Sequence, residues 1–252
     1  MLQGLFCIYR SNTMTHRSLD APTPQELFRL TDNGSGGWLQ TAKRRLKFGL
    51  RYWWCEAHLR RIHDFFLEHG LAELTRTELP VMLRPMRPYL WGGLSAEART
   101  HAMLAHFEWL MARHSAQVVV DFYKRGAYTF FKQSYPEGDI TVELEPGRGL
   151  GREGEFELHL KLNGAAVMRA AFSILPSSMV SISAPGFVMA IGNMQGQRFL
   201  NQEIKIVTQK MERTRPQNIL MTALQGLASG WQLVGMVGQA FGAGANAFGG
   251  AN

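Results

Sequence analysis

An alternating segment in the middle of the chain restricts the fold more than any other feature. Phe156–Leu162 places apolar and polar side chains in strict alternation, Asn163-Gly164 follows, and Ala165–Leu175 continues as a second extended run. A period of two is typical of a strand with one buried face, and Asn-Gly between two such runs is the strongest short-range signal of a β-hairpin. The sequence therefore predicts an antiparallel hairpin at the centre of the chain.

Further strands are expected on both sides of this hairpin. Ile140–Leu144 alternates in the same way, and both Val118–Phe122 and Tyr128–Phe131 are rich in β-branched and aromatic residues. Phe187–Ile191 is an uninterrupted apolar run, as expected of a strand that is buried on both faces. A last strand is predicted at Trp231–Val237, and it should be buried beside the Phe187–Ile191 strand.

Helical periodicity precedes and follows these strands. A helix is expected at Leu39–His69, a second one begins where Ser95 can cap it, and a helix whose first turn contains Pro216 should end at Gly230. Residues 79–93 are rich in proline and glycine and predict an irregular connection. This order predicts an α+β fold, in which N-terminal helices pack on a mostly antiparallel sheet that is followed by helices and a strand.

The domain organisation follows from the same pattern. Residues 1–37 are polar and broken by prolines and glycines, which predicts a flexible leader, and both Met1 and Met14 are candidate start positions. Residues 38–238 should form a single α+β domain. Residues 239–252 are a glycine- and alanine-rich tail that we expect to be disordered, because ordering so many glycines is costly and few large side chains can be buried.

The net charge and the cysteine content indicate which binding partners and which cellular location to expect for this protein. The 252-residue chain has a formal net charge of +7, which favours an anionic partner such as a lipid surface, a nucleic acid or a phosphorylated small molecule. Cys7 and Cys55 form neither a disulfide framework nor a metal-ligand spacing. The start lacks a convincing secretory signal, and we expect a cytoplasmic protein that is peripheral at the inner membrane.

Motifs for established chemistries are missing from the sequence. His58 and His63 are five residues apart without a His-Glu-x-x-His motif, so no metal site is predicted. A serine nucleophile elbow, a Walker loop, a dinucleotide-binding fingerprint and a base-reading motif for nucleic acid do not occur. An acidic cluster around the hairpin is interpreted as an exposed sheet face: Glu143, Glu145, Glu153, Glu155 and Glu157.

The best candidate for a ligand site is the corner that follows the Phe187–Ile191 strand. Gly192, Gln195 and Gly196 stand before a predicted helix, and glycines there let a phosphate or a pantetheine-like chain approach the backbone. Arg215 and Asn218 precede or begin the next helix, where an anion could sit. The alternative interpretations are a β-bulge that needs glycine for steric reasons and a solvated basic turn.

A basic stretch in the first long helix is a candidate membrane-binding segment. Aromatic residues follow it directly, and such a helix can lie on anionic lipid. The alternative, which we favour from the sequence, is a solvated basic edge, because Leu46, Leu50, Trp53 and Ala57 form one apolar face that should belong to the core. The candidate membrane-binding residues are Lys43, Arg44, Arg45, Lys47 and Arg51.

Short motifs in a fixed order connect the chain to a family. Together they cover roughly residues 40–235. The motifs are Pro88-Tyr-Leu90, Leu94-Ser95 with Arg99, Arg152-Glu-Gly-Glu155, Phe172-Ser173, Ile191-Gly-x-x-Gln-Gly196, Arg215-Pro-x-Asn-x-Leu220 and Ala223-Leu-Gln-x-Leu-Ala228. By them the chain resembles the bacterial VirK/YbjX family, which carries a domain-of-unknown-function label.

The resemblance implies a bacterial protein associated with virulence, envelope stress and resistance to antimicrobial peptides. It supplies no accepted catalytic residues. Family members run several dozen residues further than this chain, so the resemblance also implies a C-terminal truncation near Gly235.

The sequence supports two hypotheses about function. The first is a stress- or virulence-associated accessory protein without a cofactor, which binds an anionic envelope-related ligand or a membrane surface. The second is an acyl-CoA-dependent acyltransferase, because the order of hairpin, buried strand, glycine corner, helix and strand resembles the GNAT-type core. A splayed strand beside a bulge at Ile191 would favour the enzyme, and a filled corner would favour the binding protein. The oligomeric state is open.

Overall fold

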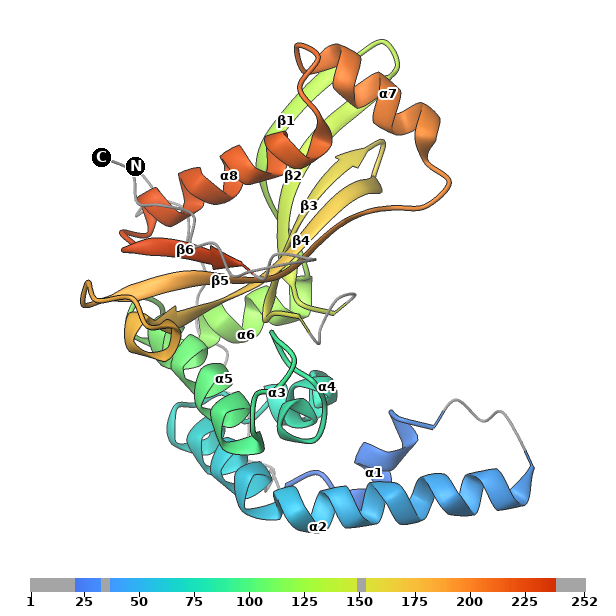
Figure 1. Cartoon of the computed structure of the whole chain (residues 1–252), viewed down its shortest axis with the longest axis vertical. Helices are drawn as coiled ribbons and strands as arrows, with labels where there is room; N and C mark the ends of the chain where they lie inside the picture. The colour runs from blue at the N-terminus through green and yellow to red at the C-terminus, as the bar shows by residue number, and fades with distance from the viewer. Residues whose placement is uncertain (1–20, 33–36, 149–152, 239–252) are drawn as a thin grey trace.

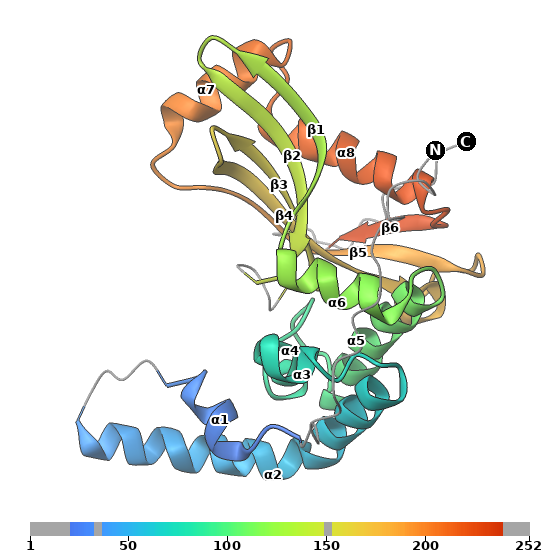
Figure 2. The same cartoon turned by 180° about the vertical axis from the view of Figure 1, so that it is seen from behind.

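The computed structural model describes residues 21–32, 37–148 and 153–238. It confirms the predicted α+β fold, with helices, a mostly antiparallel sheet, more helices and a closing strand. The helices that precede the sheet gather at one end of the molecule, and the sheet lies with α7 and α8 at the other (Figures 1 and 2). The helices are α1 (Pro24–Arg29), α2 (Trp38–Glu68), α3 (Leu74–Thr77), α4 (Leu79–Met82), α5 (Ala96–Met111), α6 (Ala116–Arg125), α7 (Asn201–Lys210) and α8 (Pro216–Gly230), with 3-10 turns η1 (Arg84–Met86) and η2 (Ser177–Val180).

The described strands form one sheet in the order β1-β2-β3-β4-β5-β6. Neighbours are antiparallel except β5 and β6, which are parallel. The hairpin at Asn163-Gly164 is confirmed, and both turn residues have the positive φ angles, 51° and 78°, that such a tight turn requires. The strands are β1 (Tyr128–Tyr135), β2 (Gly138–Pro146), β3 (Phe156–Leu162), β4 (Ala165–Pro176), β5 (Phe187–Gly196) and β6 (Gly235–Gly238).

Helices cover the sheet from two sides. Helix α8 packs against β3, β4 and β5, whereas α5 packs against β4 and α6 against β2. In Figures 1 and 2, α8 runs above β5 and β6, and α5 and α6 lie below them. Phe156 at the start of β3 joins these layers, because its ring contacts those of Phe122 on α6, His106 on α5 and Trp231 after α8. The aromatic core therefore lies where the helices meet the sheet.

Two strand predictions need correction. Val118–Phe122 lies within helix α6, where Val119, Val120 and Tyr123 are buried at helical spacing, so tertiary packing overrides the β preference of the valines. The closing strand β6 spans only Gly235–Gly238, because the chain forms a turn after α8 before it pairs with β5. Its pairing with β5 is as predicted, but its four residues are half-buried.

The first long helix is confirmed, but the environment of its apolar face differs from the prediction. Leu46, Leu50 and Trp53 are 67%, 60% and 72% exposed, so this face does not belong to the core. The core contacts of α2 come from its second half, where Cys55, Leu59, Ile62 and Phe66 are buried. Periodicity shows that a helix has an apolar face and leaves open what that face contacts.

Part of the expected leader forms a helix beside α2. Thr23 caps α1, Leu27 is buried, and the ring of Phe28 meets that of Phe48 on α2 edge to face. The expected disordered tail, residues 239–252, lies outside the described residues.

Candidate functional site

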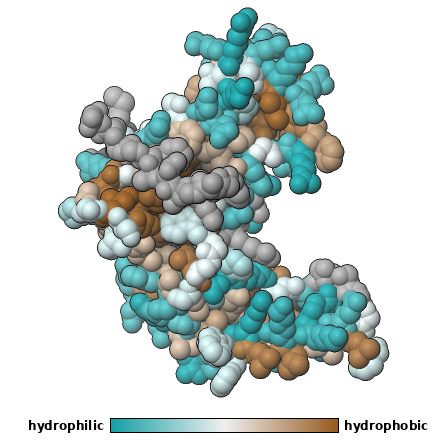
Figure 3. All heavy atoms as spheres, viewed as in Figure 1, coloured by the Kyte–Doolittle hydropathy of each residue, from teal (hydrophilic) through white to brown (hydrophobic). Residues whose placement is uncertain are grey.

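The first half of α2 presents an exposed apolar face that is unusual in this molecule. Ten large apolar side chains are exposed in the described part of the chain, and six of them lie between Trp38 and Trp54. Figure 1 shows this half of α2 extending away from the body, with α1 along one side, and Figure 3 shows apolar side chains along the same edge. The six, which we call the apolar face of α2, are Trp38, Leu39, Leu46, Leu50, Trp53 and Trp54.

Three basic side chains form a row beside this face. Lys43, Lys47 and Arg51 follow one another at intervals of four residues, so they lie along one side of the helix. All three are exposed, and none has an acidic partner within the described ranges. The other two candidates are engaged with α1 instead, since Arg44 pairs with Asp32 at 3.2 Å and Arg45 lies over the ring of Phe28.

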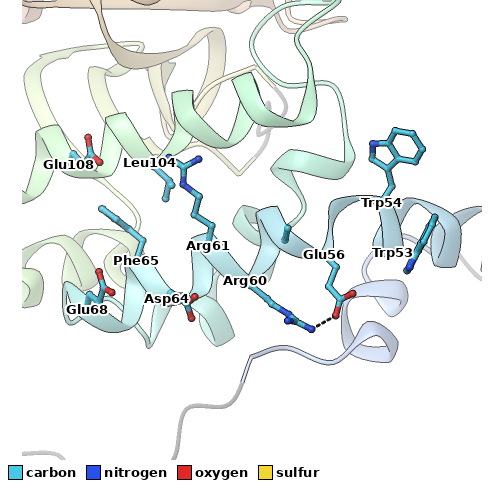
Figure 4. A pocket seen from close by; sticks show the side chains of 11 residues that line it. Trp53, Trp54, Glu56, Arg60, Arg61, Asp64, Phe65, Glu68, Leu104 and Glu108 are labelled. Atoms are coloured by element: carbon cyan, nitrogen blue, oxygen red, sulfur yellow. Dashed lines mark hydrogen bonds and ion pairs between the residues drawn. The ribbon is translucent and has the colours of Figure 1, made fainter.

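The apolar face passes into a charged depression in the second half of α2. An open depression of about 790 Å³ lies between α2 and α5, and its wall includes Trp53, Trp54, Arg61 and Glu108 (Figure 4). Arg60 donates to Glu56 at 2.7 Å and Arg61 to Glu97 at 2.8 Å. The face of α2 is therefore apolar toward its N-terminal end and charged toward its C-terminal end.

The glycine corner is a β-bulge that other parts of the protein fill. Ala171 pairs with Asn193 and Phe172 with Ile191, so Gly192 is the extra residue of β5. A Cβ atom on Gly192 would lie 1.9 Å from the carbonyl oxygen of Glu153. The Asn193 side-chain amide also donates to the Glu153 carboxylate at 2.8 Å. Gly192 thus gives room to a neighbouring backbone segment.

The five candidate ligand residues lie in two separate places. Gln195 and Gly196 pair with Arg169 and Met168 at the end of β5, whereas Arg215 caps α8 and Asn218 lies in its first turn. The ten residues of α7 intervene, and a helix of that length spans about 15 Å. The far end of α7 is held at the β1–β2 turn by a 2.7 Å ion pair between Lys210 and Glu137. The helix and strand geometry gives no support to a combined site.

A buried ion pair joins the helical part to the sheet. The Arg84 guanidinium on η1 donates to both carboxylate oxygens of Glu155, at 2.7 and 3.1 Å, and both side chains are almost fully buried. Glu157 is buried as well, so the interpretation of the acidic cluster as an exposed face is wrong for these two residues. Alternation alone did not show this, because the η1 segment that supplies Arg84 is far away in sequence.

Tyr89 and Ser173 extend this pair into a polar junction. The two hydroxyl groups are 2.8 Å apart, and the backbone N–H of Glu155 donates to the Ser173 oxygen at 3.0 Å. Burial raises the pKa of Tyr89 well above its ordinary value, so its hydroxyl stays protonated. Tyr89, Glu155 and Ser173 all belong to motifs that carry the family resemblance, whereas Arg84 had no such signal. These motifs therefore meet at one structural contact, which we call the polar junction.

His106 on α5 lies next to the polar junction and should make stability depend on pH. It accepts the backbone N–H of Ile174 at 3.1 Å, and burial lowers its pKa from 6.5 to about 4. Between these values the unfolded chain binds a proton that the folded protein does not, so stability falls as the pH falls. The stability advantage of the wild type over His106→Gln should shrink by about 3 kcal/mol between pH 7 and pH 4, as measured by urea unfolding. An advantage that does not change with pH would contradict a neutral buried His106.

The described ranges contain neither a cluster of metal ligands nor a membrane-spanning helix. No group of three or more histidine, cysteine or acidic residues there is arranged to hold a metal ion. Among the described helices, none is both long and apolar enough to span a membrane.

Comparisons with known proteins connect the chain to one family. Searches of curated proteins and of solved structures gave no match. A family model described as "Protein of unknown function (DUF535)" matches residues 37–240, which is most of the chain and includes α2, the sheet and α8. The protein is therefore a member of the DUF535 family.

Proposed function

We propose that this protein is a peripheral membrane-binding accessory protein whose first half of α2 lies on an anionic lipid surface. The observation that carries the proposal is the apolar face of α2 beside the row of Lys43, Lys47 and Arg51. Tryptophan and leucine on one side of a helix and basic residues beside them are typical of helices that lie in the membrane interface. The association with virulence and envelope stress that the VirK/YbjX resemblance implies is part of this proposal, as is a location at the inner membrane.

The electrostatic part of this binding should be strong and sensitive to salt. Each basic residue near an anionic surface contributes about 1 kcal/mol, and this attraction decreases over one Debye length, about 8 Å at physiological ionic strength. The basic row should therefore steer the helix to the membrane. The apolar face then gains free energy by leaving water, at about 25 cal/mol per Å² of buried apolar surface.

The alternative, an acyl-CoA-dependent acyltransferase, has less support. Its cofactor was expected to approach the backbone at Gly192–Gly196, but the Glu153 backbone fills the space beside Gly192. A filled corner favours a binding protein. The acyltransferase and its acyl-CoA cofactor stay predictions from the sequence.

The first test replaces the basic row by acidic residues. The variant Lys43→Glu, Lys47→Glu, Arg51→Glu should lose at least about a hundredfold in affinity for phosphatidylglycerol vesicles in co-sedimentation, because three attractions of about 1 kcal/mol each become repulsions. The wild type should bind more weakly as salt is added. The matched control is Arg198→Glu, Lys205→Glu, Arg213→Glu, which makes the same change in net charge at exposed residues on and around α7. Equal loss in both variants would mean that net charge, and not α2, drives binding.

The second test removes the apolar face and leaves the charges in place. Leu46→Gln, Leu50→Gln and Trp53→Gln together should weaken vesicle binding while changing the free energy of unfolding by less than about 0.5 kcal/mol per site, since all three side chains are exposed. A blue shift of tryptophan fluorescence on adding vesicles should occur in the wild type and decrease in the variant. Unchanged binding by this variant would show that the apolar face does not contact lipid.

A further inference from the structure

A second candidate site lies where the helical part meets the end of β2 and the start of β3. A cavity of about 420 Å³, partly open to solvent, is lined by α4, η1, α6, the end of β2 and the residues before β3. This volume lies within the roughly 300–1,000 Å³ range of small-molecule sites. Its wall combines charged and apolar groups: Thr77, Glu78, Pro80, Val81, Arg84, Tyr123, Pro146, Gly147, Arg148 and Glu155.

Two ion pairs in this wall differ in how easily they can open. The inner pair, Arg84 with Glu155, is buried and bonded through both carboxylate oxygens. The outer pair is also bonded through both carboxylate oxygens, since the Arg148 Nε donates to one oxygen of Glu78 at 3.2 Å and Nη2 donates to the other. The same Nη2 also donates to the backbone carbonyl of Tyr123. The Arg148 side chain is 48% exposed, whereas that of Glu78 is 11% exposed. Water and solutes reach the Arg148 guanidinium, and an exposed charge gains less from pairing than a buried one, so the outer pair is easier for a ligand to open than the inner pair.

One buried polar group in the wall has no partner. The Tyr123 hydroxyl is fully buried and makes no hydrogen bond in the described part of the chain. Burial raises its pKa well above the ordinary value, so it keeps its proton. A buried hydroxyl without a partner is rare in folded proteins, but this oxygen presents no surface to the cavity, so it is not among the groups that would contact a ligand.

We propose that this cavity binds a small zwitterion with an apolar side chain, of the α-amino acid class. A ligand with a single charge would separate Arg148 from Glu78 and leave one of them uncompensated. A zwitterion inserts between them, its carboxylate accepting from Arg148 and its ammonium group donating to Glu78, so that one ion pair becomes two. Pro80, Val81 and Pro146 provide apolar surface for the side chain. The inner pair keeps the wall fixed and carries no net charge that would select an anion or a cation.

Three probes that share the leucine side chain and differ in charge test this assignment. L-leucine carries both charges, leucinamide lacks the carboxylate, and N-acetyl-leucine lacks the ammonium group. Leucine should bind the wild-type protein in an NMR titration, and the other two should bind about tenfold more weakly or less, since each loses a bond to a charged group. Equal affinity for all three, or no binding of leucine, would overturn the proposal.

Variants of the outer pair test whether leucine binds in this cavity. Glu78→Gln and Arg148→Gln should each weaken leucine binding about tenfold, whereas Lys132→Gln on β1, which removes the same charge as Arg148→Gln, should bind leucine like the wild type. Arg148 is exposed enough that its variant folds even if Glu78→Gln does not. Wild-type affinity for leucine in Arg148→Gln would place leucine elsewhere and overturn the proposal.

Discussion

Replacing Gly192 by alanine should lower the free energy of unfolding by roughly 3 kcal/mol or more. The added Cβ would lie 1.9 Å from the Glu153 oxygen, 2.7 Å from its carbonyl carbon and 3.0 Å from its Cα. These are backbone atoms, so no side-chain rotation can relieve the overlap. The segment has no room to retreat either, because a Cβ on the next residue, Gly154, would lie 2.3 Å from the Phe172 nitrogen. Urea unfolding measures the loss.

Gly196→Ala is the matched control for this prediction. Gly196 ends the same strand, its φ is not positive, and the nearest atoms to an added Cβ are 3.7 and 3.8 Å away. Alanine there should leave stability unchanged or raise it by about 0.4–1 kcal/mol, because the unfolded chain loses freedom. If both variants lose similar amounts of unfolding free energy, the contact with Glu153 is not the reason that Gly192→Ala is destabilising.

The second large effect is expected when one partner of the buried ion pair is removed. Glu155→Leu should destabilise the protein by about 3–5 kcal/mol, because the Arg84 guanidinium would stay buried without a compensating charge. The Glu155 side chain is also the group that Arg84 of η1 bonds on the sheet side, so the variant should loosen the attachment of η1 to the sheet. Denaturant unfolding and hydrogen exchange at Ile174 and its neighbours measure the two effects.

Removing both charges shows how much of the lost stability comes from leaving one charge buried without a partner and how much comes from losing the bonds of the pair. The double variant Arg84→Met, Glu155→Leu should recover most of the stability that Glu155→Leu loses, because no buried charge is then left alone. Lys132→Gln, which breaks an exposed pair with Asp139, should cost less than about 1 kcal/mol and is the matched control. A double variant as unstable as Glu155→Leu would show that the bonds of the pair themselves hold the junction together.

The polar junction has a consequence for the proposed function. It attaches η1 to the sheet, and η1 packs against both α2 and α5. Through these contacts, which include the Cys55 thiol 3.7 Å from the Pro85 carbonyl oxygen, α2 is held on a fixed base from which its first half extends. Under the proposed function, a helix on such a base would keep one orientation relative to the sheet, so that the row of Lys43, Lys47 and Arg51 and the apolar face would meet the lipid surface together.

Local sequence determined much of the fold. The Asn163-Gly164 hairpin, the strands that flank it, the cap at Ser95 and the proline in the first turn of α8 all appear where the sequence predicts them. Each depends on the conformational preference of a few adjacent residues and on periodicity. The prediction was wrong for Val118–Phe122, because its β-branched residues are held in α6 by the burial of Val119, Val120 and Tyr123.

Tertiary structure alone decided the environments that matter for function. The sequence placed Leu46, Leu50 and Trp53 on one face of a helix, but whether that face is covered depends on what packs beside it, and it is exposed. The sequence put Gly192 at a strand end, but the chain segment at Glu153 that fills the bulge comes from about forty residues away. Glu155 finds Arg84 across 71 residues. Local periodicity reports the direction of a side chain, and only the packing of distant segments determines whether it meets water, lipid or a buried charge.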